Sequence, residues 1–190
     1  MKKSKLKILG KTEFGNPILK KNVARLSKSE ILSSDTQQLI ANMRYTLQEK
    51  NYGIALAAPQ IGKSLALAVI HIRPTKIRPN LPKSKWADLV IINPKITKTY
   101  GAKIPTWEGC ISLAEVFAKV PRYKKVQVEY LDENAVKLTR TFEGLLAQVI
   151  QHEIDHLNGI LFVDRVKDAR TFMSGSEYRK RIVSKNPSGE

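Results

Sequence analysis

The sequence has little cysteine, relatively few acidic side chains and no long hydrophobic run. Its single cysteine, Cys110, cannot form an intrachain disulfide, so it is either an inert core residue or a chemically active one. No apolar stretch approaches the ~20 residues that a membrane-spanning helix needs. The lysine-rich N-terminus lacks the apolar segment that follows the lysines of a secretion signal. These absences predict a cytoplasmic protein that makes no membrane contact.

Acidic residues are outnumbered by basic ones, 17 against 33, and the formal net charge is +16. Such an excess attracts polyanions such as RNA or the ribosome, but a solvated lysine-rich surface explains it equally well. The sequence has no Gly-rich phosphate loop and no recognition-helix pattern. Charge alone therefore leaves a basic RNA-binding protein open as an alternative.

The length of 190 residues and the hydrophobic content of 42% are typical of one soluble globular domain. Strands followed by one strong helix predict an α+β fold, with mixed or antiparallel sheets packed around that central helix. The apolar pattern predicts a helix at 29–50 and strands at 65–72, 89–92 (closed by Asn93-Pro94), 125–131 and 136–140. It also predicts a helix at 142–157 with Thr141 as its N-cap, and a strand at 160–163.

The helix at 142–157 carries the pattern HExxH, from His152 to His156. Residues four apart lie on one face of a helix, so both imidazoles can reach a single metal ion. Glu153 is rotated by one residue and can act on a water molecule without occupying a ligand position. A lone histidine on an apolar face is usually a core residue, but here two of the chain's three histidines share one stripe with Leu145 and Val149. We interpret the pattern as a metal site.

A catalytic site of this kind needs a third protein ligand. The acidic residues downstream lie in a predicted strand or in the basic tail, which disfavours an ordinary zinc protease. The upstream candidate is Cys110, although a single cysteine is more often a small core residue. A thiolate and two imidazoles make a soft ligand set with an open fourth position.

Three segments resemble the signature motifs of peptide deformylases, in the family's order and at similar separations. They are GIALAAPQ at 53–60, EGCIS at 108–112 and QHEIDHLNG at 151–159, and flanking similarity extends the resemblance over roughly residues 5–165. The resemblance implies a deformylase-like catalytic domain at 1–165. Residues 166–190 then form a basic C-terminal segment, partly helical or disordered.

The resemblance also implies roles for individual residues. Cys110, His152 and His156 would bind one divalent metal ion, commonly Fe2+ in this family, with Zn2+, Ni2+ or Co2+ able to replace it. Glu153 would serve as general base and then general acid. The Gln60 side chain and the Ile111 backbone N–H would stabilise the oxyanion.

The implied substrate is formyl-methionine at the N-terminus of nascent proteins. The residues expected around it are Gly53, Ile54, Ala55, Glu108, Gly109, Leu145 and Val149. Glu108 and Arg122 are expected to form a supporting ion pair, the alternative being a surface pair of little value. The basic C-terminal segment would contact the ribosome.

One departure from the family pattern is Ala55, which stands where the motif normally has a second glycine. An added methyl group there could crowd the substrate backbone. This leaves open a related amide hydrolase with an altered acyl substrate or weak activity. An RNA-binding protein with a purely structural metal site needs neither Glu153 nor Gln60, so their presence argues against that alternative.

Overall fold

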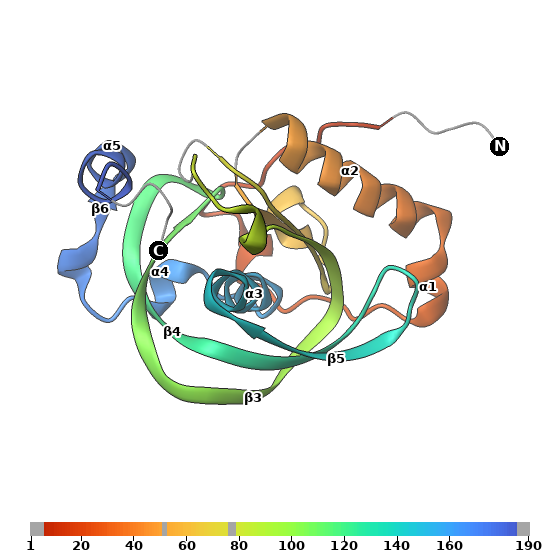
Figure 1. Cartoon of the computed structure of the whole chain (residues 1–190). Coiled ribbons are helices and arrows are strands. Elements are labelled where there is room, and N and C mark those ends of the chain that lie inside the picture. The colour runs from red at the N-terminus through yellow and green to blue at the C-terminus, as the bar shows by residue number, and fades with distance from the viewer. Residues whose placement is uncertain (1–5, 51–52, 76–78, 186–190) are drawn as a thin grey trace.

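The computed structural model describes residues 6–50, 53–75 and 79–185. Within them an antiparallel sheet has the strand order β1-β2-β3-β4-β5, and β6 pairs separately with β4. The strands are β1 (Ala55–Ala57), β2 (Leu67–Ile72), β3 (Ala87–Cys110), β4 (Leu113–Leu131), β5 (Lys137–Glu143) and β6 (Met173–Ser174). Figure 1 shows β3 and β4 as long curved strands that wrap around a central helix.

That central helix is α3 (Gly144–Leu157), and it carries HExxH. The predicted α+β fold around a central helix is therefore confirmed. The remaining helical elements are η1 (Pro17–Lys20), α1 (Lys28–Leu32), α2 (Ser34–Lys50), η2 (Ala58–Ile61), η3 (Lys83–Lys85), α4 (Phe162–Arg165), η4 (Ala169–Thr171), α5 (Gly175–Tyr178) and the π-helical turn η5 (Arg179–Val183). None of the helices in the described ranges has the length and apolar character needed to span a membrane.

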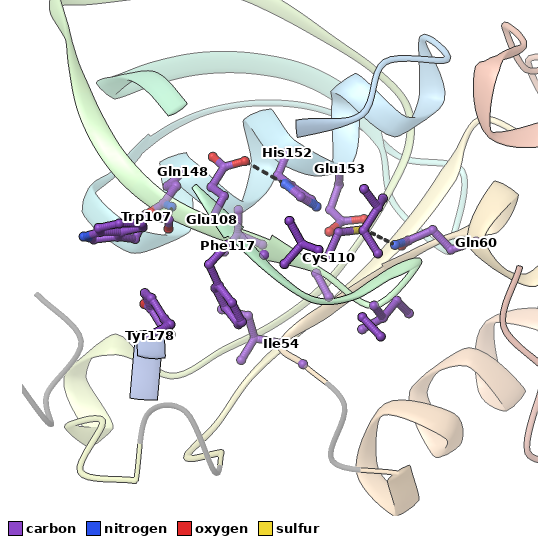
Figure 2. Close-up of a pocket in the computed structure, with 18 of the residues that line it drawn as sticks. Ile54, Gln60, Trp107, Glu108, Cys110, Phe117, Gln148, His152, Glu153 and Tyr178 are labelled. Atoms are coloured by element: carbon purple, nitrogen blue, oxygen red, sulfur yellow. Dashed lines mark hydrogen bonds and ion pairs between the residues drawn. The ribbon is translucent and has the colours of Figure 1, made fainter. Parts of the chain in front are cut away.

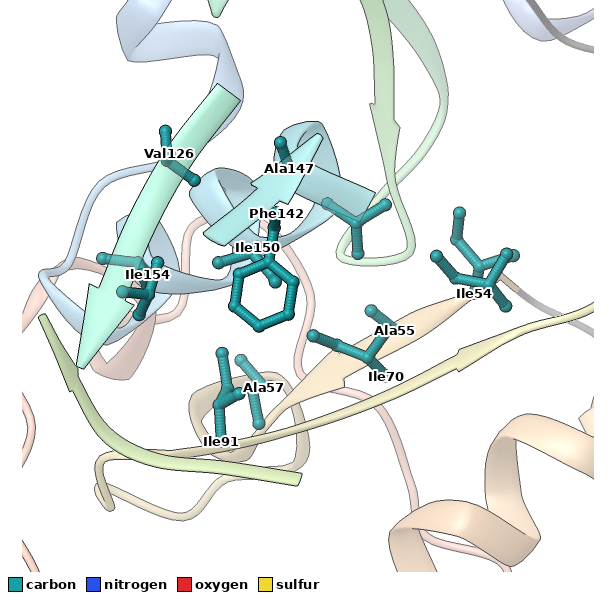
Figure 3. Close-up of a cluster of buried hydrophobic side chains, with 14 of the residues drawn as sticks. Ile54, Ala55, Ala57, Ile70, Ile91, Val126, Phe142, Ala147, Ile150 and Ile154 are labelled. Atoms are coloured by element: carbon teal, nitrogen blue, oxygen red, sulfur yellow. The ribbon is translucent and has the colours of Figure 1, made fainter. Parts of the chain in front are cut away.

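The sheet separates two apolar clusters. On one face, Ala147, Ile150 and Ile154 of α3 belong to the same cluster as Ala55 and Ala57 of β1 (Figure 3). On the other face, Leu56 lies in the cluster to which α2 contributes its buried side chains, Ile40, Met43 and Leu47. Because side chains alternate across a strand, this short β1 joins both halves of the core and brings the first motif against α3.

The predicted strand at 89–92 does not end at Asn93-Pro94, and that prediction was wrong. β3 continues to Cys110, with a register shift between Ile92 and Lys95. Asn93 has a φ of 52°, and its side-chain amide exchanges two hydrogen bonds, of 2.9 and 2.7 Å, with the backbone of Leu26. Proline is tolerated at such a bulge, so the strand bends here and carries on to the site.

Helix boundaries also differ from the expected ones. The helix predicted at 29–50 is broken at Ser33 into α1 and α2, because Ser33 adopts an extended backbone. Thr141 is not an N-cap: it lies in β5, where it pairs with Gln127 of β4, and α3 begins at Gly144. The strand predicted at 160–163 was wrong: Phe162 begins the short helix α4, whose first turn is capped by Asp164, which accepts a 2.7 Å hydrogen bond from the Leu161 N–H.

The C-terminal segment, as far as it is described, folds back onto the domain. β6 pairs with the first part of β4, with Ser174 opposite Val116 and Met173 opposite Phe117. Figure 1 shows α5 beside β6 at the edge of the molecule, next to the curved end of β4. This contact places residues from the far end of the sequence beside the EGCIS motif.

Candidate metal centre and substrate cleft

Three potential metal ligands converge from two elements. Cys110 is the last residue of β3, and His152 and His156 lie one turn apart on α3. Their ligand atoms all lie within 4.8 Å of one another, and Cys110 Sγ is 3.3 Å from His156 Nε2. His152 and His156 lie four residues apart on one face of α3, and β3 ends beside that face. Both histidines therefore lie close to Cys110.

A buried ionic network orients His152. Its Nδ1 lies 2.8 Å from a carboxylate oxygen of Glu108, which leaves Nε2 for the ligand cluster. Arg122 donates two hydrogen bonds to Glu108, of 2.7 and 3.0 Å, and a third of 2.6 Å to Asp155. Glu108 is 5% exposed and Arg122 is 4% exposed. The predicted ion pair is confirmed, and the alternative of a surface pair is wrong.

Charges in the cluster shift one another's pKa values. Burial of Glu108 opposes its ionisation, but His152 and Arg122 outweigh burial and lower the pKa of its carboxyl to about 2. Burial likewise opposes ionisation of Cys110, yet the neighbouring His156 and His152 bring the pKa of its thiol well below the usual range. A thiolate is the form in which cysteine binds metals.

Glu153 is buried beside this cluster. Burial is the main cause that raises the pKa of its carboxyl. Its Oε2 has no hydrogen-bond partner among the described residues. A buried carboxylate oxygen without a protein partner is one that a bound water molecule or substrate group can satisfy. Together with the soft donors of Cys110, His152 and His156, this fits a divalent metal ion with one ligand position left open.

The amide of Gln60 has a defined orientation. Its Oε1 accepts a 2.8 Å hydrogen bond from the Ala57 N–H, and a backbone N–H can meet only the oxygen of an amide. The NH2 group therefore faces the site and lies 3.2 Å from Cys110 Sγ. Ile111 lies in the turn between β3 and β4 and lines the same cavity.

A cavity of about 320 Å³ opens onto the cluster. All seven residues expected to contact substrate line it: Gly53, Ile54, Ala55, Glu108, Gly109, Leu145 and Val149. The cavity is also lined by residues that the motifs did not single out, among them Trp107, Phe117, Gln148 and Tyr178 (Figure 2). Trp107 precedes the EGCIS motif and could have been suspected from that position. Nothing in the local sequence marks Tyr178, which reaches the cavity only because the chain folds back.

Comparisons with known proteins agree with this geometry. A family model described as polypeptide deformylase matches residues 10–172. Peptide deformylase 2 of Nostoc sp. is 33% identical over 174 residues, covering 92% of this chain and 94% of that protein. Peptide deformylase of Aquifex aeolicus is 39% identical over 172 residues, covering 90% and 95%. A class I type b peptide deformylase from Acinetobacter baumannii, solved with Met-Ala-Ser bound, superposes with a TM-score of 0.79 at 34% identity, covering 85% of this chain and all of that one.

Proposed function

The chain belongs to the peptide deformylase family, and we propose how its residues carry out the family's reaction. It is a hydrolase that removes the formyl group from formyl-methionine at the N-terminus of nascent proteins. The observation that carries our assignment of roles is that the cluster of Cys110, His152 and His156 adjoins a cavity lined also by Glu153 and Gln60. The alternative of an altered acyl substrate is not favoured.

Cys110, His152 and His156 hold one divalent metal ion in this proposal. We propose Fe2+ as the ion in the cell, with Zn2+, Ni2+ or Co2+ able to take its place, since a mixed thiolate and imidazole set suits all of them. When bound, such an ion polarises a carbonyl oxygen and lowers the pKa of water toward neutrality. Glu108 supports the site by fixing the ring of His152 through the 2.8 Å hydrogen bond to Nδ1.

Glu153 moves the proton. Its raised pKa, and an Oε2 that no described residue hydrogen-bonds, suit a group that accepts a proton from the attacking water and then donates it to the departing amine. The Gln60 NH2 group, locked in orientation by Ala57, and the Ile111 N–H donate to the oxyanion that forms on the formyl oxygen. Loss of one such donor typically costs about 3 kcal/mol of transition-state stabilisation.

The apolar part of the cavity receives the methionine side chain. Ile54, Leu145 and Val149 supply its apolar lining, and Gly53, Ala55 and Gly109 bring backbone close to the substrate. Formyl is the smallest acyl group, so a tight space at the ligand cluster can exclude acetyl. Selectivity then comes from shape at the acyl group and from apolar contact at the methionine.

The test is release of formate from a formyl-Met tripeptide by protein loaded with Fe2+ under anaerobic conditions, or with Ni2+. Glu153→Ala should abolish turnover while it still binds metal stoichiometrically, and the acetylated analogue should not be hydrolysed. Glu143→Ala is the matched control, because Glu143 is exposed at the end of β5 and should leave turnover unchanged. A metal-loaded wild type that releases no formate would contradict the assignment.

We also propose that the enzyme acts in the cytoplasm and that the basic segment 166–190 assists contact with the ribosome, beside a catalytic domain formed by 1–165. Several of its cations already pair with carboxylates of the chain itself, which limits the charge left for RNA: Arg170, Arg179 and Arg181. Reversal of the exposed Lys167 and Lys180 to glutamate should reduce co-sedimentation with ribosomes. The same reversal at the exposed Lys63 and Lys95 is the control, and equal effects of the two pairs would contradict a specific role for the segment.

A further inference from the structure

We propose that the C-terminal segment completes the substrate cleft. In this proposal Tyr178, with Trp107 and Phe117, forms an aromatic wall that receives the side chain of the residue after the substrate's methionine. The inference rests on the proposed function, since it assumes a formyl-Met peptide in the cavity. It names a specificity-determining residue that lies beyond the region 10–172 matched by the family model.

The three rings are in mutual contact. Tyr178 stacks on Phe117, with centroids 4.1 Å apart and planes inclined by 3°, and it meets Trp107 edge-on at 5.6 Å and 65°. Tyr178 is 6% exposed and lines the same cavity as Cys110 and Glu153. The edge-on contact with Trp107 has the geometry that aromatic pairs favour, and the stacked contact packs a face of Tyr178 against Phe117. The ring of Tyr178 is therefore a packed part of the cavity wall.

The backbone that carries Tyr178 is held close to the cleft. β6 fixes its approach by pairing with β4, and Arg179 donates two hydrogen bonds to Glu115, of 3.1 and 2.9 Å. Gly175 sits so close that a Cβ atom there would lie 1.9 Å from Glu115 Oε2. Glu115 itself has a φ of 61°, which a non-glycine residue keeps only when its surroundings hold it in place.

The position of the rings indicates what they contact. Figure 2 shows Trp107 and Tyr178 on the side of the cavity away from Gln60. Glu108 and Cys110 lie between these two rings and Gln60 in that view. A peptide whose formyl group lies at the ligand cluster must leave the cleft in some direction after its methionine. The Acinetobacter baumannii relative was solved with Met-Ala-Ser bound, so a similar protein binds a peptide longer than one residue.

Ring faces and edges are apolar surfaces that favour aromatic or large aliphatic side chains over glycine. We therefore expect this enzyme to prefer peptides with such a side chain directly after methionine. Truncation of Tyr178 removes the ring that both stacks on Phe117 and closes the wall beside Trp107, so the preference should weaken while the reaction at the ligand cluster is retained.

The test compares hydrolysis of formyl-Met-Phe-Ser and formyl-Met-Gly-Ser by the full, metal-loaded chain. Tyr178→Ala should lower kcat/KM for the Phe peptide about three- to tenfold, mainly through KM, and change that for the Gly peptide less than about twofold. Tyr178→Phe should restore the preference. Phe172→Ala is the matched control, because Phe172 is an exposed aromatic of the same segment that does not line this cavity.

Equal losses on both peptides, or no loss on either, would overturn the proposal. If Tyr178→Ala does not fold, the ratio of the wild-type kcat/KM values for the two peptides decides. The absence of any preference for the Phe peptide would then overturn the proposal. If the wild type releases no formate from either peptide, the proposed function fails instead. Calorimetric binding of Met-Phe-Ser and Met-Gly-Ser then decides the inference separately, and equal affinities would overturn it.

Discussion

Arg122 and Glu108 form a two-point hydrogen-bonded pair in the protein interior, directly behind the ligand cluster. The same carboxylate contacts His152 Nδ1, and the same guanidinium reaches Asp155, which lies inside the HExxH motif. One arginine on β4 thus connects β3 to α3 at the point where the ligands meet. The position of the ligand cluster depends on a charge network of Glu108, His152, Asp155 and Arg122, of which Arg122 alone lies outside the signature motifs.

Removal of Arg122 should be strongly destabilising. Arg122→Ala removes the cation that two buried carboxylates share and leaves Glu108 with His152 and Asp155 with the half-buried Arg165. Breaking a buried pair in this way costs about 3–5 kcal/mol of unfolding free energy. Urea unfolding followed by circular dichroism measures the loss. Arg170→Ala is the control, because its pair with Asp168 is exposed and should not shift the midpoint. Similar midpoints for the two variants would show that the Arg122 network contributes little.

Neutralising Glu108 should weaken metal binding. Glu108→Gln keeps the shape of the side chain but removes the negative charge that orients His152, and such supporting partners are worth about 10- to 100-fold in metal affinity. Competition with a chelator measures the affinity. Glu129→Gln, on β4 in an exposed pair with Lys137, is the control. An affinity equal to that of the wild type would mean that the ring of His152 is held by packing alone.

The ionisation of Glu108 should make stability depend on pH in the acid range. Its folded pKa of about 2 lies below the ordinary value of 4.5, so its stabilising contribution is present above pH ~4.5 and is lost as the pH falls toward about 2. In metal-free protein, the difference in unfolding free energy between wild type and Glu108→Gln should shrink across that window. Urea titrations at a series of pH values test this, and a difference that stays constant would argue against a depressed pKa.

Gly109 should not tolerate a side chain. A Cβ atom there would lie 2.5 Å from the ring of Phe117, which is itself held by Tyr178. Gly109→Ala should therefore cost about 1–3 kcal/mol of stability. It should also reduce turnover, because relief of the clash must move either the Phe117 ring or the backbone directly before Cys110. Thermal unfolding and formate release provide the two measurements. Gly10→Ala is the control, since no atom lies within 4 Å of a Cβ placed there, and an equal effect of both substitutions would contradict the steric argument.

Ala55 should affect stability more than catalysis. Its side chain belongs to the apolar cluster against α3, so the methyl group packs in the core as well as bordering the cavity. Ala55→Gly should lower stability by about 0.5–1 kcal/mol and change kcat/KM less than about threefold. Ala68→Gly, in the same apolar cluster on β2 but outside the cavity lining, should lose similar stability with no change in kcat/KM. A large gain in activity for Ala55→Gly alone would show that the methyl group obstructs substrate.

Features that depend on local periodicity and on residue chemistry could be predicted from the sequence alone. The HExxH spacing on a helix, the single cysteine after Glu-Gly and the order of three motifs predicted the ligand set and the family, and strands followed by one strong helix predicted the α+β class. The Glu108–Arg122 pair was also expected, but its burial was not, because burial depends on how β3, β4 and α3 pack together. Asn93-Pro94 misled for a related reason: its local signal for a turn is satisfied by a bulge that Leu26 holds from elsewhere in the chain.

The sequence by itself determined which residues can bind metal, act on a proton and donate to an oxyanion, since these properties belong to residue types and to spacings within single elements. Tertiary structure alone decided that Arg122 also reaches Asp155, that the Gln60 NH2 group meets Cys110, and that Tyr178 enters the cavity wall. Each of these depends on a contact between segments far apart in sequence. Such contacts form only when the whole core closes, and no local pattern encodes them.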